Sequence, residues 1–87
     1  MKAKLNDGFE IEISESVTDD WEFLEVLASI DEGETGLIVR AAKMLLGNDG
    51  VKSLKEHLRN KDGKVSSTAM VTALGELMES VNSLKNS

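Results

Sequence analysis

The sequence contains neither cysteine nor proline, and it has a single histidine, His57. Without cysteine the chain can form no disulfide, thiolate metal site or cysteine nucleophile, which fits a reducing cytoplasm. Without a second histidine or a cysteine, His57 has no partner for a zinc site or a nucleophile–base pair. No glycine-rich phosphate loop follows a predicted strand. We therefore expect a protein that is not an enzyme and that uses no metal or cofactor.

Long hydrophobic runs are also missing. No apolar run approaches the roughly 18 residues that a membrane span needs. The polar residues Asn6, Asp7 and Gly8 interrupt the N-terminal region, where a signal peptide would be apolar. A chain of 87 residues is long enough for one domain with a modest core. We expect a single soluble domain over residues 1–87.

The acidic charge is unevenly distributed along the chain. Residues 1–34 contain 11 acids and 2 bases, a net charge of −9, whereas residues 35–87 contain 8 bases and 5 acids, a net charge of +3. The simplest interpretation is a solvated surface on both halves. The alternative is head-to-tail attraction between copies, which propagates into a ring or a helical array. The residues expected to carry this self-association are Asp19, Asp20, Glu22, Asp31, Glu32, Glu34, Lys52, Lys55 and Arg59.

The N-terminal residues have the alternating pattern of a β-hairpin. Apolar residues occupy every second position on both sides of Asp7-Gly8, from Ala3 to Ile13. Asp-Gly favours a tight hairpin turn because both residues tolerate positive φ. A hairpin over residues 2–13 must pack on other elements, since an isolated pair of strands is marginally stable.

Four helices follow in the predicted fold, at about residues 19–30, 36–46, 50–60 and 67–84. The fold class is therefore α+β and mainly α, with the hairpin packed on about four helices. The helix over residues 19–30 is apolar around most of its circumference and contains Trp21, so it is expected to be the hub of the core. Gly47 is expected to end the helix that precedes it.

The last helix carries a broad apolar stripe. Its apolar residues repeat at helical spacing, and the simplest interpretation is that the whole stripe is internal. The alternative is that one edge of the stripe, with Met70, Leu77 and Leu84, receives a partner helix. The candidate binding residues of this stripe are Met70, Leu74, Leu77, Met78, Val81 and Leu84.

A small helix-turn-helix DNA-binding regulator is the alternative at the level of function. Lys52, Lys55 and Arg59 share one face of the predicted helix over residues 50–60, where they could contact phosphates. The acidic chain and the lack of aromatic or amide side chains beside these bases argue against this interpretation.

The order of these parts resembles the small tail assembly chaperones of long-tailed bacteriophages, especially those that infect Gram-positive hosts. The hairpin LNDGFEIEI leads into the acidic segment VTDDWEFLE. The most specific part is residues 44–66, MLLGNDGVKSLKEHLRNKDGKVS, which are followed by the closing helix and a final Lys-Asn-Ser. The resemblance covers nearly the whole chain and contains no catalytic signature.

This resemblance implies a role in building the phage tail. Members of the family coat the long, helical tape-measure protein before tail-tube subunits polymerise around it, and they self-associate. They act in the cytoplasm of the infected or lysogenic bacterial host and are absent from the mature virion, with neither nucleic acid nor membrane as a partner. A longer product of ribosomal frameshifting recruits the tail-tube protein, and codons AAA AAC for Lys85-Asn86 would form a slippery site. The stripe of the last helix is then the expected client-binding surface.

Overall fold

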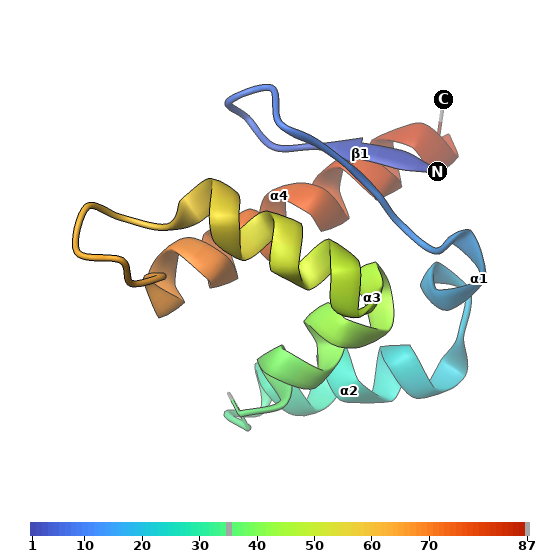
Figure 1. Cartoon of the computed structure of the whole chain (residues 1–87). Coiled ribbons are helices and arrows are strands. Elements are labelled where there is room, and N and C mark those ends of the chain that lie inside the picture. Colours follow the sequence, from blue (N-terminus) through green and yellow to red (C-terminus); the bar gives the residue numbers. More distant parts are fainter. Residues whose placement is uncertain (35, 87) are drawn as a thin grey trace.

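The computed structural model describes the backbone of residues 1–34 and 36–86 and the side chains of residues 1–34 and 36–82. Two strands precede four helices along the chain, which confirms the predicted α+β, mainly α class (Figure 1). The elements are β1 (Lys2–Lys4), β2 (Glu10–Glu12), α1 (Glu15–Thr18), α2 (Trp21–Asp31), α3 (Leu37–Leu58) and α4 (Ser67–Asn86). The four-residue helix α1, which joins the hairpin to α2, was not predicted.

The two strands form the predicted antiparallel hairpin, in which Ala3 lies opposite Ile11. These two side chains are buried, while their neighbours along each strand are exposed, as the alternating pattern requires. In the turn, Gly8 has a φ of +95° and the side chain of Asp7 accepts a hydrogen bond from the amide of Phe9 at 2.9 Å. The turn therefore forms at the predicted Asp-Gly pair, although of the two residues only Gly8 has a positive φ.

Helix α4 covers the outer edge of β1. The amide of Lys4 donates a hydrogen bond to Ser80 Oγ at 3.1 Å, and the amide of Asn6 donates one to Glu76 Oε1 at 2.7 Å. Both acceptors lie on α4, so side chains of a helix satisfy amides that would pair with a third strand in a larger sheet. This contact protects one edge of a sheet that has only two strands.

Helix α3 is the centre of the fold, because α1, α2, α4 and β2 all pack on it. The chain bends at Gly47, which has φ +72° and ψ 170°. Two helices on either side of Gly47 were predicted, but the second one already includes residues 48–50. A Cβ atom on Gly50 would lie 2.8 Å from the Cβ of Leu46, so glycine is required at this close approach as well.

The prediction that residues 19–30 form the hub of the core is wrong. Phe23 is the buried residue of α2, whereas Trp21 is 70% exposed and Leu24 is 55% exposed. A small domain has too few elements to cover every apolar face, so α2 packs along one side only. The central core residues are Ala3, Leu5, Ile11, Ile13, Phe23, Ala41, Leu45, Leu46, Leu54, Ala73, Leu77 and Val81.

Candidate helix-binding groove

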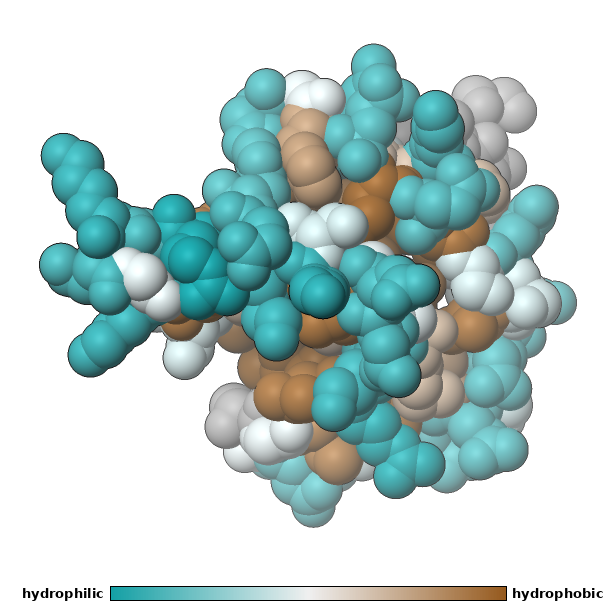
Figure 2. Space-filling model, in the orientation of Figure 1, coloured by the Kyte–Doolittle hydropathy of each residue, from teal (hydrophilic) through white to brown (hydrophobic). Residues whose placement is uncertain are grey.

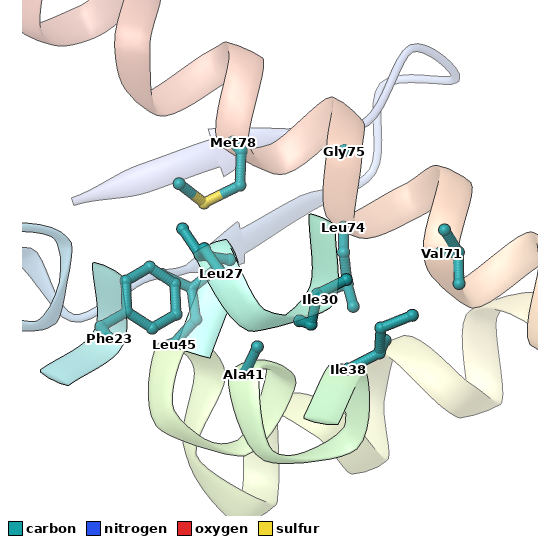
Figure 3. A pocket seen from close by; sticks show the side chains of 10 residues that line it. All are labelled: Phe23, Leu27, Ile30, Ile38, Ala41, Leu45, Val71, Leu74, Gly75 and Met78. Carbon is teal, nitrogen blue, oxygen red and sulfur yellow. The ribbon is translucent and has the colours of Figure 1, made fainter. Parts of the chain in front are cut away.

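An open apolar groove lies between α2, α4 and residues 37–46 of α3, and we call it the α2–α3–α4 groove (Figure 3). Residues of α3 form its floor, and α2 and α4 form its two walls. Its volume is about 170 Å³. The residues that line it are Phe23, Leu27, Ile30, Ile38, Ala41, Leu45, Val71, Leu74, Gly75 and Met78.

The groove exists because α2 and α4 both pack on α3 and do not pack extensively on each other. Within the wall formed by α4, Gly75 contributes no side chain. A Cβ atom added there would have no heavy atom within 4 Å, so the space in front of Gly75 is open. Met78 and Leu74 point from α4 toward the side chains of α2 and α3 (Figure 3).

The chemistry of the lining is uniform. Every side chain in it is a hydrocarbon or, at Met78, a thioether, so the groove offers no acid, base or nucleophile for catalysis. An apolar ligand gains about 25 cal/mol for each Å² of surface that it buries there. The unbranched Met78 can adjust to ligands of different shape. The groove is therefore suited to apolar side chains of a partner.

Exposed apolar residues continue beyond the groove. Leu24 lies one turn before Leu27 on the same side of α2, and Val71 in the opposite wall is 46% exposed. Figure 2 shows hydrophobic residues at the surface in the lower part of the view, where α2 and the start of α3 lie. Leu24 and Val71 therefore extend the apolar surface at the groove, which is a feature of protein-binding surfaces.

The structure divides the predicted binding residues of the last helix into two groups. Leu77 and Val81 are 0% and 1% exposed, so they belong to the core and their edge of α4 is internal. Met70 is half-buried and lies outside the groove, whereas Leu74 and Met78 line it. The side chain of Leu84 lies outside the described residues. The open edge of α4 is thus the one opposite to the edge proposed from the sequence.

Sequence reasoning missed most of the groove. Val71 and Gly75 were not among the predicted binding residues, and neither were the contributions of α2 and α3. The glycine inside a helix was the one available signal, because Gly75 costs helix stability and no close packing inside the domain requires it. The other lining residues could not be recognised from the sequence. An apolar side chain at helical spacing is predicted to be buried in the core, whether or not another element covers it.

The charged residues proposed for self-association are all on the surface. Arg59, however, is engaged within the chain: it donates to Glu56 Oε1 at 2.8 Å and to the carbonyl oxygen of Gly63 at 2.7 Å. The hydrogen bond from Arg59 lowers the pKa of the Glu56 carboxyl. Lys52 and Lys55 take part in no ion pair among the described residues. With Arg59 paired and Glu56 on the same helix, the geometry does not favour the helix-turn-helix alternative.

His57 connects the hairpin turn to α3. Its Nε2 atom lies 2.7 Å from Asp7 Oδ2, and its ring stacks on that of Phe9 with a centroid distance of 4.0 Å and an interplanar angle of 13°. Hydrogen bonds from the Phe9 amide and from His57 lower the pKa of Asp7. Among the described residues, no group of three or more potential ligands is placed to hold a metal ion. His57 is therefore interpreted as a structural contact.

Comparisons of the chain with protein-family models, with curated proteins and with solved structures found no match. The fold and the groove define a small, mainly helical α+β domain with an open apolar groove. In the described part of the chain, no helix is both long and apolar enough to cross a membrane.

Proposed function

We propose that this protein is a phage tail assembly chaperone that holds helical segments of the tape-measure protein in the α2–α3–α4 groove. The groove is the observation that supports this proposal, because an entirely apolar channel between helices suits the apolar face of another helix. The resemblance of the chain to tail assembly chaperones supplies the identity of the client. The chaperone acts in the bacterial cytoplasm before tail-tube subunits polymerise, and it is not retained in the virion.

The dimensions of the groove fit a short helical segment. Along α2 the lining runs from Phe23 to Ile30, which is about 10 Å at the helical rise of 1.5 Å per residue. A client helix with apolar residues at positions i, i+3 or i+4, and i+7 presents an apolar stripe of the same length. One copy of the chaperone therefore covers about two turns of the client, and a long tape-measure protein requires many copies.

Because many copies cover one client, neighbouring copies lie next to each other along it, and we propose that they bind each other. In the proposed array, the acidic residues on and around α2 of one copy attract Lys52 and Lys55 of the next, with a smaller contribution from Arg59 because Glu56 already binds it. A longer product made by ribosomal frameshifting would carry the extension that recruits tail-tube protein. The array then keeps the client covered until the tube replaces it.

The test is co-expression of the chain with the product of the long, helix-rich reading frame expected next to its gene. The client is expected to stay in solution and to co-purify with the wild-type chain. Val71→Glu places a charge in the groove at a position that is already half exposed, and it should abolish co-purification without unfolding the domain. Val39→Glu is the matched control, because Val39 is 60% exposed and does not line the groove. Equal retention of the client by both variants would contradict the proposal that the groove is the binding site.

A further inference from the structure

We infer that the α2–α3–α4 groove selects amphipathic helices that carry lysine or arginine at both ends of their apolar stripe. This inference deepens the proposed function and rests on it, since it assumes that a helix occupies the groove. It concerns the acidic residues around the groove, which the proposed function assigns to self-association and not to recognition of the client.

Acidic residues stand at both ends of the wall formed by α2. Asp20 is the N-cap of the helix and Asp31 is its last residue, so the two carboxylates stand at opposite ends, about 16 Å apart along the axis. Asp31 also shares a face of α2 with Leu24 and Leu27, because it follows them by seven and four residues. No basic residue occurs anywhere in residues 19–34, which contain Asp19, Asp20, Glu22, Glu25, Asp31, Glu32 and Glu34.

The wall formed by α4 has the same sign of charge. Glu79 is exposed and follows Gly75 by four residues, so it lies one turn further along the same face. Among the described residues, Asp20, Asp31 and Glu79 take part in no ion pair. Their charges are therefore not neutralised by a close partner within the described part of the chain.

The basic residues of α3 point elsewhere. Ile38, Ala41 and Leu45 face the groove at spacings of three and four residues, which places Arg40 and Lys43 on the other side of the helix. Lys52 and Lys55 follow the bend at Gly47 and lie outside the groove lining. The described charges at the rim are thus acidic around an apolar interior, and the complementary ligand is apolar in the middle and basic at its ends.

Gly75 adds a second feature to this specificity. Gly75 lines the groove and has no heavy atom within 4 Å of its Cβ position, so the backbone of a bound helix can approach α4 more closely there than at a residue with a side chain. A substitution of Gly75 consequently blocks the groove while raising helix propensity. Loss of binding in such a variant cannot be attributed to loss of the fold.

The experiment uses three synthetic 18-residue peptides and isothermal titration calorimetry with the wild-type chain. All three contain leucines at positions i, i+3 and i+7 of a helix-forming, alanine-rich sequence; one has two lysines at each end, one has two glutamates at each end, and one has the lysine ends with scrambled leucines. The lysine-ended amphipathic peptide is expected to bind at least tenfold more tightly than either of the others. Its affinity should fall as salt increases from 50 to 500 mM, since salt screens exposed charges.

Two pairs of variants locate the interaction. Gly75→Gln should weaken binding of the lysine-ended peptide at least tenfold, whereas Thr72→Gln, on an exposed part of α4 outside the lining, should leave it unchanged. The double variant Asp20→Asn/Asp31→Asn should weaken binding about fivefold to tenfold at low salt. The double variant Glu10→Gln/Asp62→Asn changes the net charge equally at exposed sites away from the groove and should have no effect.

The outcomes separate this inference from the proposed function. If the glutamate-ended peptide binds as tightly as the lysine-ended one, the charge selection is overturned even though the groove still binds helices. If Gly75→Gln and Asp20→Asn/Asp31→Asn bind the lysine-ended peptide like the wild type, the assignment to this groove is overturned. If no peptide binds but the tape-measure protein still co-purifies, the inference fails while the chaperone proposal stands.

Discussion

Gly47 and Gly75 both lie within the bounds of long helical elements, but substitution by alanine should change stability in opposite directions. Gly47 has φ +72° and ψ 170°, a region that glycine alone occupies readily, so Gly47→Ala should destabilise the domain by about 1–3 kcal/mol. Gly75 has open space at its Cβ position, so Gly75→Ala should stabilise the domain by roughly 1 kcal/mol. Urea denaturation monitored by circular dichroism measures both changes. If Gly47→Ala were stabilising, α3 would be a continuous helix in solution, without the bend at Gly47.

The contact between Asp7 and His57 predicts that the stability of the folded protein depends on pH. The folded protein lowers the pKa of Asp7 below its ordinary value of 3.8, mainly through the hydrogen bond from the Phe9 amide and then through His57. A carboxyl with a depressed pKa contributes stability that is fully present above its unfolded pKa and is lost as pH falls through its folded pKa. The wild type should therefore melt at a higher temperature than Asp7→Asn at pH 6, and the difference should shrink as the pH falls below 3.8. The variant Glu10→Gln, at an exposed carboxylate of the same hairpin, is the control; a difference for Asp7→Asn that does not depend on pH would contradict the prediction.

At the scale of elements, the fold depends on α4 taking the place of a third strand beside β1. Removing the acceptor with Glu76→Ala should expose the Asn6 amide and destabilise the hairpin by about 0.5–1.5 kcal/mol, the usual net contribution of a hydrogen bond. Glu76→Gln keeps an oxygen acceptor and should retain most of the stability. Amide hydrogen exchange at Asn6 is the direct measurement, and it should be faster in the alanine variant than in the glutamine variant. Equal exchange in both variants would show that Glu76 does not hold this edge in solution.

At the scale of the whole molecule, the acidic residues of α2 and the basic residues Lys52 and Lys55 of α3 lie at different sides of the structure. Helix α2 runs along the bottom of Figure 1, whereas the end of α3 and the turn that follows it project at the left. Figure 2 shows that this projection is covered by hydrophilic residues. If each interface joins α2 of one copy to this region of the next, the contact is heterologous and propagates into an open array or a ring.

This arrangement predicts self-association that weakens with salt. At about 100 µM and low salt, sedimentation velocity should show species larger than the monomer, and 500 mM salt should reduce them because each exposed pair contributes at most about 1 kcal/mol. Lys52→Glu/Lys55→Glu should remove the larger species at low salt, whereas Lys61→Glu/Lys64→Glu, with the same change in charge on the neighbouring turn, should remove fewer. A monomer under both salt conditions would contradict the charge-based contact and leave the apolar surface around α2 as the candidate.

Several features of the fold were determined by the sequence itself because their causes are local. The Asp-Gly turn and the alternation from Ala3 to Ile13 specify the hairpin, since turn geometry and strand period involve only neighbouring residues. Gly47 was predicted to end a helix and lies at the bend of α3, because the conformation of a glycine is also a local property. Helical spacing correctly identified the long helix α4 and included Leu74 and Met78 among its candidate binding residues.

The tertiary structure alone decided which apolar faces are covered. Periodicity gives the direction of an apolar side chain relative to its helix, but burial depends on whether another element lies in that direction. Helix α3 packs with most of the other elements, so it became the hub, and α2 was left with Trp21 and Leu24 exposed. Leu77 and Val71 belong to one stripe of α4, yet Leu77 is buried and Val71 faces the open groove. The difference arises because a domain with few elements cannot surround every apolar helix, and only the packing of the elements shows which face remains uncovered.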